Sequence, residues 1–454
     1  MNMRSVLKVA LFGDSKSSLT SRLAQGAFWS LIATVVYRGS TLVSSIAVAR
    51  ILGKEEFGKF GIIQSTAMMF LVFAGAGLGL TCTRFVSQFR AKAPQSAGGV
   101  IGLSLIVSFI GGLIAALGLF LFSAPISARL LAAPELSTLL RIASPGLLLA
   151  ALNAAQVGSL VGFEAFRSLA VVNGVAGCLS LPIVVGGVYA YGLGGAVWGT
   201  VISLALLCVC SQIALWRQCR AAGIVIKLSQ CRTQLNILWQ FTVPAAMAAS
   251  LVGPVNWICS AMLVNQPNGY AEMGVFNAAN QWFGALLFLP AILGQAALPA
   301  LSESFGDQNS LQVSKLLKFC VKANLIIIGP IVVLGSLASP AIMRLYGSGF
   351  VQSWPVLVVV FCTAGMVAIQ TPIGDLIVAS GQMWKGFLLN GIWAIVFILV
   401  TYETVHQGAL GLANARLFAY VIHSVGTVWL AAYFLRSSTS KSTGLTRSNI
   451  VPEL

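Results

Sequence analysis

The chain alternates between long runs of apolar residues and short stretches marked by glycine, proline or charge. An apolar run of about 20 residues can cross the hydrocarbon core of a bilayer as a helix. The boundaries of these runs predict twelve such helices, at residues 24–52, 59–82, 98–123, 142–163, 168–189, 194–216, 237–264, 273–301, 316–343, 353–380, 384–405 and 408–435. The pattern therefore predicts an all-α integral membrane protein.

The first of these helices carries a charged residue, Arg38, about halfway along its length. Thr34, Thr41 and Ser45 share one helical face with it, because they follow at steps of three or four residues. A charge at that depth costs something like 3 kcal/mol on insertion scales. We therefore expect Arg38 to face protein or water, as part of the wall of a cavity.

The longest polar connection lies near the middle of the chain and predicts two six-helix halves. Three pairs of segments match at similar offsets, namely 57–61 with 270–274, Gly162 with Gly381, and 192–195 with 408–411. An even number of helices per half predicts a pseudo-two-fold axis along the membrane normal. The expected parts are a cytoplasmic segment at 1–22, a first half at 23–216, a connection at 217–236, a second half at 237–436 and a cytoplasmic tail at 437–454.

Composition agrees with a membrane protein, since 57% of the residues are hydrophobic and 8% are charged, against about 25% charged in soluble domains. The predicted helices leave almost no room for an extramembrane domain, which excludes a soluble catalytic domain. The net charge of +16 would suggest nucleic-acid binding in a soluble protein. Here the predicted helices place nineteen Lys and Arg residues on one side and five on the other. This bias predicts cytoplasmic N- and C-termini and no nucleic-acid partner.

No catalytic or metal-binding constellation emerges from the sequence. The nine cysteines lack metal-ligand spacing, and His406 and His423 are the only histidines. His423 is predicted to be a packed neutral residue, with a proton relay as the alternative. We therefore expect neither an enzyme nor a resident cofactor or metal.

Two ionisable residues lie within predicted helices of the second half, Asp375 in helix 10 and Arg416 in helix 12. A carboxylate at that depth is either the partner of a buried arginine or a titrating site for a coupling proton or cation. An Asp375–Arg416 ion pair and separate functional roles both remain open.

Further candidates lie near helix ends or carry amide groups. Arg50 lies one turn from the outer end of helix 1, where a lipid-headgroup contact is the alternative to substrate binding. Arg84 follows the cytoplasmic end of helix 2, where an arginine is expected even without a role in substrate binding. The amides suit either sugar hydroxyls or hydrogen bonds between helices, and they are Gln64, Asn277, Asn280 and Gln281.

Three segments of the first two helices carry a family resemblance: Gly26-Ala-Phe-Trp29, Val48-Ala-Arg-Ile-Leu-Gly53-Lys-Glu-Glu-Phe-Gly58 and Thr83-Arg-Phe85. They resemble the oligosaccharide flippases of the polysaccharide biosynthesis transporter family, within the multidrug/oligosaccharidyl-lipid/polysaccharide exporter superfamily. The resemblance implies a bacterial inner-membrane protein. It also implies a substrate of undecaprenyl diphosphate bearing a short oligosaccharide, which moves from the cytoplasmic to the periplasmic leaflet by alternating access.

On this interpretation the arginines bind the diphosphate, with Arg38 as the chief contact, the amides bind sugar, and Asp375 is a coupling site for a proton or Na⁺. The implied partners are the lipid-linked oligosaccharide, membrane lipids, a polysaccharide polymerase and glycosyltransferases. Two alternatives remain. A cation-coupled drug exporter of the same superfamily needs acids in its cavity, and a membrane-embedded polysaccharide polymerase needs a sizeable outer loop.

Overall fold

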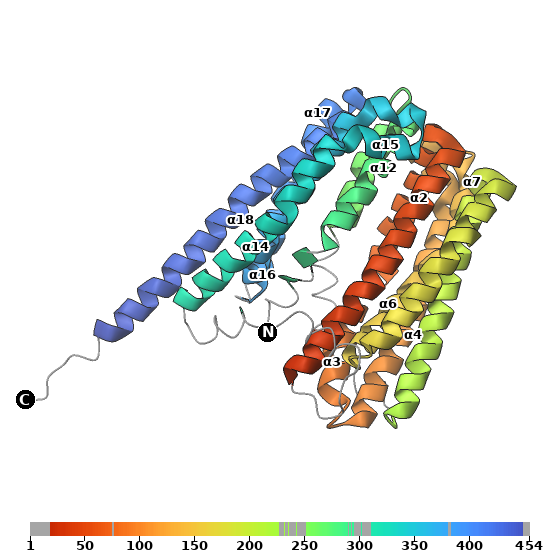
Figure 1. Ribbon diagram of the computed structural model, residues 1–454. Helices are drawn as coiled ribbons and strands as arrows, with labels where there is room; N and C mark the ends of the chain where they lie inside the picture. The colour runs from red at the N-terminus through yellow and green to blue at the C-terminus, as the bar shows by residue number, and fades with distance from the viewer. Residues whose placement is uncertain are drawn as a thin grey trace, which may run out of the picture. The chain divides into compact units, whose positions relative to one another are not determined.

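The computed structural model describes residues 19–74, 77–226, 251–288, 310–379 and 383–447, and the single positions 231, 235, 242, 290, 291, 293, 294 and 301. Regular structure in these residues is entirely helical. The chain divides between Trp257 and Ile258 into two compact units, each of which is a bundle of helices (Figure 1).

The first unit is built around two long helices, α2 and α7, which pack along each other. Helix α6 packs against both α3 and α4 as well as α7. The elements are α2 (Leu19–Leu71), η1 (Val72–Ala74), α3 (Leu78–Phe89), α4 (Pro94–Pro125), η2 (Ile126–Leu130), α5 (Leu136–Ala143), α6 (Pro145–Gly162) and α7 (Phe166–Ala221).

Glycines with positive φ interrupt the long helices of this unit. Gly53 (φ 74°) breaks α2, and Gly192 (φ 54°) breaks α7 beside Tyr191. Both breaks lie at predicted helix boundaries, since a left-handed residue ends a helix and glycine adopts it without steric cost. The predicted helix at 59–82 is instead divided, because α2 ends at Leu71 and α3 begins after Gly77 (φ 91°). The short helix α5 is also absent from the prediction.

Helices α3 and α6 approach each other closely through glycine. A Cβ atom on Gly158 would lie 2.2 Å from the carbonyl oxygen of Gly79. Thr83 Oγ1 donates a hydrogen bond to the Gly158 carbonyl oxygen at 3.1 Å. Small residues at such crossings allow backbone-to-backbone contact, as is typical of membrane helices.

The second unit contains α12 (Gly269–Leu286), α14 (Ser310–Leu337), α15 (Ser339–Tyr346), η4 (Ser348–Ser353), α16 (Trp354–Ala379), α17 (Met383–Thr404), η5 (Val405–Gln407) and α18 (Gly408–Arg447). Helix α11 (Val252–Val264) contains the division between the units. Its first turns belong to the first unit, where Trp257 Nε1 donates to Thr66 Oγ1 at 2.9 Å. The predicted connection at 217–236 and the boundaries of the two halves stay predictions.

Helices α12 and α18 lie side by side and run in the same direction. Glu272, in the first turn of α12, accepts a hydrogen bond at 2.8 Å from the backbone N–H of Ala409, at the start of α18. A carboxylate is favourable there because the N-terminus of a helix carries partial positive charge. Two turns further along both helices, Asn280 contacts Arg416. The Glu272 contact thus fixes the register of α12 against α18.

The turns before the last helix of each predicted half share their backbone geometry. Gly192 and Gly408 have φ of 54° and 70°. Three residues later, a Cβ on Gly195 would lie 1.8 Å from the Gly187 carbonyl oxygen, and a Cβ on Gly411 would lie 1.9 Å from the Thr404 carbonyl oxygen. This pair of matched segments is therefore similar in structure as well as in sequence. Gly381, in another predicted match, lies outside the described residues.

We expect Gly411→Ala to destabilise the protein, because the new methyl group would force α17 and α18 apart. Overpacking of this kind costs about 1–3 kcal/mol. Gly391→Ala in α17 is the matched control, since its Cβ would meet no atom within 4 Å and alanine favours a helix by about 0.5–1 kcal/mol over glycine. Thermal unfolding in detergent should show a lowered midpoint for Gly411→Ala alone. Equal midpoints for the two variants would contradict the close turn.

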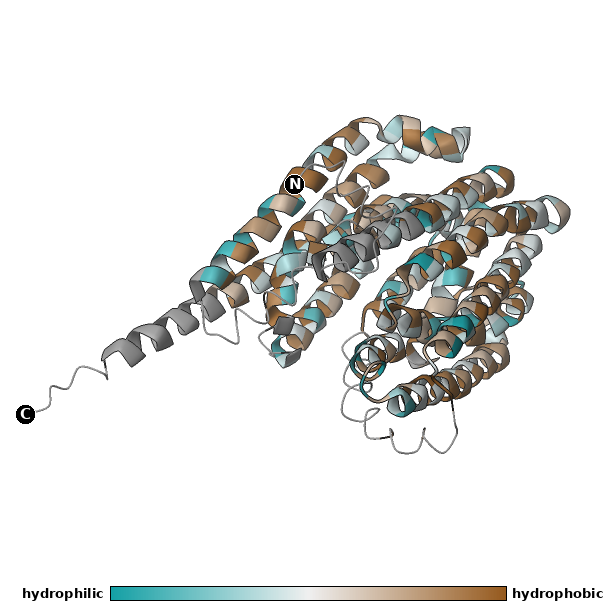
Figure 2. Ribbon diagram, turned by 60° about the horizontal axis from the view of Figure 1, so that its bottom comes forward, coloured by the Kyte–Doolittle hydropathy of each residue, from teal (hydrophilic) through white to brown (hydrophobic). Residues whose placement is uncertain are grey.

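The helices carry hydrophobic residues along most of their length (Figure 2), and many of these side chains are exposed. Ile114, Leu121 and Leu337, for example, are 65%, 68% and 76% exposed. Water-soluble monomers rarely expose such continuous apolar surface. Within the part of the chain that the structure describes, seven helical segments are long and apolar enough to cross a membrane. The chain is therefore a multi-pass membrane protein, and the number of twelve helices stays a prediction.

Candidate functional site

The second unit contains a buried arginine, Arg416, which is 5% exposed. Its Nη1 donates a hydrogen bond to Asn280 Oδ1 at 2.7 Å. Its guanidinium carbon lies 3.7 Å from the centroid of the Phe283 ring. Asn280 and Phe283 are three residues apart on α12 and so share one face of that helix. The guanidinium is therefore held between an amide oxygen and an aromatic face, both of which favour a cation.

No carboxylate neutralises this arginine among the residues that the structure describes. Asp375 on α16 forms no ion pair with Arg416, so the pair that the sequence left open is not formed. Asp375 Oδ2 is buried without a hydrogen-bond partner, close to Gly294, whose Cβ would lie 2.7 Å away. A buried cation that lacks a counter-charge is costly, and an anionic ligand would offset that cost.

The other predicted amides of α12 lie beside this arginine in sequence. Asn277 is 9% exposed, and its Nδ2 is buried without a hydrogen-bond partner. Gln281, directly after Asn280, is half-buried. Asn280 is used as an interhelical acceptor, which was the alternative to a sugar contact. The sugar-binding role of these amides stays a prediction.

In the first unit, the polar residues predicted to share one face of α2 with Arg38 lie in two different environments. Arg38 and Thr41 are exposed, and Thr41 Oγ1 donates to the Tyr37 carbonyl oxygen of its own helix at 2.9 Å. Ser45 is 8% exposed and is thus buried within the unit. The side chain of Thr34 lies outside the described residues. Arg38 therefore lies on an outer face of its own bundle.

The remaining candidates of the first unit do not belong to this group of polar residues. Arg50 is exposed near the break in α2, and Arg84 is exposed on α3, where its guanidinium carbon lies 5.5 Å from the centroid of the Phe85 ring. Gln64 lines a cavity of about 240 Å³ between α2, α5, α6 and α7. Apart from Gln64 and Thr200, the side chains that line this cavity are apolar. The structure of the first unit does not gather these candidates into one cluster.

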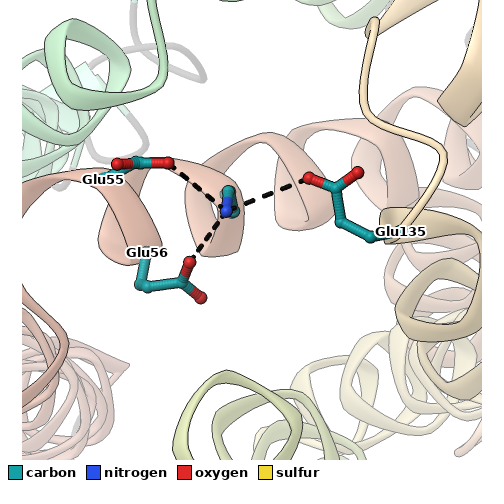
Figure 3. Close-up of polar contacts among 4 residues, drawn as sticks. Glu55, Glu56 and Glu135 are labelled. Atoms are coloured by element: carbon teal, nitrogen blue, oxygen red, sulfur yellow. Dashed lines mark hydrogen bonds and ion pairs between the residues drawn. The ribbon is translucent and has the colours of Figure 1, made fainter. Parts of the chain in front are cut away.

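The motif that follows Arg50 contributes to an ion-pair cluster around Lys59 (Figure 3). Lys59 Nζ lies 2.8 Å from Glu56 Oε1, 3.4 Å from Glu55 Oε1 and 3.9 Å from Glu135 Oε1. Glu135 directly precedes α5, so the cluster connects α5 to the second part of α2. Partly exposed pairs of this kind contribute up to about 1 kcal/mol each. Glu55 and Glu56, which belong to the segment that follows Arg50, therefore stabilise the packing of α5 against α2 through Lys59.

Two residues that contact Arg416 or His423 were not among the candidates predicted from the sequence. Phe283 stacks on Arg416, and its spacing of three from Asn280 was the available signal. Asn390 lies 3.2 Å from His423, and nothing in the spacing along α17 marked it.

Sequence comparison relates the chain to known proteins of polysaccharide biosynthesis and export. A family model described as polysaccharide biosynthesis protein matches residues 23–305. The EPS I polysaccharide export inner membrane protein EpsE of Ralstonia solanacearum is 23% identical over 86% of this chain and 89% of its own length. The succinoglycan biosynthesis transport protein ExoT of Rhizobium meliloti is 26% identical over 91% and 80%. The lipid III flippase of Escherichia coli is 24% identical over 88% and 96%.

Solved structures establish the fold. An inward-facing multidrug resistance MATE family transporter of the MOP superfamily aligns with a TM-score of 0.79, at 17% identity, over 92% of this chain and 99% of that one. A MOP superfamily transporter from Pyrococcus furiosus aligns with a TM-score of 0.65, also at 17% identity, over 97% and 99%. The chain thus has the fold of this transporter superfamily. Because the family model matches more than half of its length, the chain belongs to the polysaccharide biosynthesis protein family, which confirms the resemblance of its first two helices.

Proposed function

We propose that the protein is a flippase that moves an undecaprenyl-diphosphate-linked oligosaccharide from the cytoplasmic to the periplasmic leaflet of a bacterial inner membrane. The observation that carries this proposal is the buried guanidinium of Arg416, whose neighbours are an amide and an aromatic ring, with no carboxylate beside it in the described parts of the chain. A site of this composition attracts an anion rather than a cation.

A diphosphate suits the Arg416 site chemically. A guanidinium has five N–H donors in a planar fork that matches phosphate oxygens. Asn280 accepts one hydrogen bond, from Nη1. In surroundings of low dielectric constant, a charge-assisted hydrogen bond to phosphate is about twice as strong as a neutral one.

The other candidates take supporting roles in this proposal. Arg38 is the chief diphosphate contact in the first unit, and Arg84 and Arg50 assist it. Gln64, Asn277, Asn280 and Gln281 contact the oligosaccharide. Asp375, whose buried Oδ2 has no hydrogen-bond partner, is the coupling site for a proton or Na⁺.

Transport would proceed by alternating access between two halves of six helices each, with both termini in the cytoplasm. The shared geometry of the turns at Gly192 and Gly408 supports such a repeat. Transporters built from parallel repeats rock one half against the other around the substrate.

The names of the relatives favour a saccharide substrate, because they are a polysaccharide export protein, a succinoglycan transport protein and a lipid III flippase. The likeness to multidrug transporters is one of fold. Glycosyltransferases would supply the lipid-linked oligosaccharide on the cytoplasmic side, and a polysaccharide polymerase would consume it on the other side.

Deletion of the gene is expected to cause a lipid-linked oligosaccharide to accumulate in the cytoplasmic leaflet and to stop surface polysaccharide synthesis. Leaflet location is measured by accessibility of the sugar to a membrane-impermeant probe, in intact spheroplasts and in inverted vesicles. Complementation with the full chain should restore both phenotypes. Accumulation in the periplasmic leaflet would instead place the protein after the flipping step.

A further inference from the structure

His423 on α18 lies between polar side chains of two neighbouring helices. Its Nδ1 is 3.3 Å from Gln370 Oε1 on α16, and its Nε2 is 3.2 Å from Asn390 Oδ1 on α17. Ser424 Oγ lies 2.7 Å from the same Gln370 oxygen. Both nitrogens of the half-buried ring therefore face side-chain amides that belong to different helices.

These neighbours satisfy the imidazole in either protonation state. With both amide oxygens facing the ring, both nitrogens donate, which requires the imidazolium. The neutral ring fits when the Gln370 amide turns over, since exchange of Oε1 and Nε2 leaves its shape almost unchanged. The Ser424 hydroxyl then has another acceptor, the Tyr420 carbonyl oxygen at 2.7 Å. One turned amide is thus the whole structural difference between the two states.

Among the ionisable residues of α16, α17 and α18, four lie nearest along the chain to His423 or to the amides that it contacts. Tyr420 presents its ring edge-on, with ring centroids 6.3 Å apart. Arg416 lies seven residues earlier on α18, about 10 Å along the helix axis. Asp375 is the ionisable residue nearest to Gln370 along α16, and Lys385 is the one nearest to Asn390 along α17.

We propose that His423 is a reversible proton-binding site that joins α16, α17 and α18, and that its protonation and the binding of an anion at Arg416 favour each other. The second part rests on the proposed function. A proton on His423 adds a positive charge near the Arg416 guanidinium, and an anion at Arg416 removes the resulting repulsion. The coupling is reciprocal, because each ligand must change the affinity for the other by the same factor.

The proton site is tested directly, because the chain has two histidines and His406→Gln leaves His423 as the only imidazole. NMR of the full chain with ¹⁵N-labelled histidine, recorded as a pH titration over the range in which the protein stays folded, should show a reversible change from a neutral tautomer to the imidazolium. The variant with His423→Gln in addition should lose the signal. A ring that keeps one protonation state wherever the protein stays folded would overturn the proposal.

The coupling is tested with inorganic diphosphate as the probe. Its affinity for the full chain should be about tenfold higher below the His423 midpoint than above it, as two charges about 10 Å apart would produce. His423→Gln should lose this increase. An equal increase in His423→Gln would overturn the coupling. If Arg416→Met bound diphosphate as tightly as the wild type, the proposed anion site would fail while the NMR result for His423 stood.

Discussion

Replacement of Arg416 by alanine is expected to abolish oligosaccharide export while the protein still accumulates in the membrane. The alanine removes the cation on which the proposed diphosphate site depends. Two lost charge-assisted hydrogen bonds of about 1.5 kcal/mol each would lower export about 100-fold or more. Arg416→Lys should restore part of the activity, because lysine retains the charge but neither the planar fork nor the stacking on Phe283. Surface polysaccharide and protein abundance are measured together in the deletion strain.

A second variant distinguishes loss of the charge at position 416 from loss of folding. Arg416→Met retains an elongated side chain beside Phe283 without burying a charge, so we expect its unfolding temperature to equal or exceed that of the wild type. Arg344→Ala is the matched control, since Arg344 lies exposed on α15 of the same unit. Normal polysaccharide from a stable Arg416→Met protein would contradict the anion site.

Arg38→Ala is expected to abolish export as well, although it should make insertion of α2 easier. An arginine near the middle of a membrane helix costs something like 3 kcal/mol, and an alanine there costs almost nothing. A residue that is costly to insert yet necessary for transport has a functional role. Arg38→Lys should rescue export only in part. The measurements are surface polysaccharide and the amount of membrane-inserted protein.

The matched control for Arg38 is Arg129→Ala, because Arg129 is an exposed arginine of the same unit, in the short η2 element. It lies outside the proposed site and should export normally. If Arg38→Ala and Arg129→Ala gave the same amount of surface polysaccharide, Arg38 would have no part in substrate binding.

Much of the fold follows from local signals in the sequence. Apolar runs of sufficient length specify membrane helices, and glycine at 53, 192 and 408 provides the positive φ at which helices end. The interruption between Leu71 and Leu78 was harder to predict, because the apolar run at 67–80 continues through it without a polar residue. The short helix α5 was missed for the opposite reason, since eight residues give too brief a pattern.

The site depends on contacts between distant parts of the chain, and the sequence predicted it less well. Arg416 and Asn280 were both candidates, yet the choice between an Asp375–Arg416 ion pair and separate roles for these two residues remained open. That choice depends on the register of α12 against α18, which the Glu272 contact with the Ala409 backbone fixes across 137 positions of sequence. No pattern within one helix specifies such a register.

The hydrogen bond between Glu272 and the start of α18 restricts how these two helices can move against each other. Helices α12 and α18 are joined at this end by a hydrogen bond and two turns further on by the contact between Asn280 and Arg416. Two hydrogen bonds two turns apart would resist sliding of one helix along the other, so we expect the pair to move together. The guanidinium and its amide partner would then be carried intact through a transport cycle. In the proposed transport cycle, release of the substrate would accordingly depend on the side of the membrane to which this helix pair exposes the site.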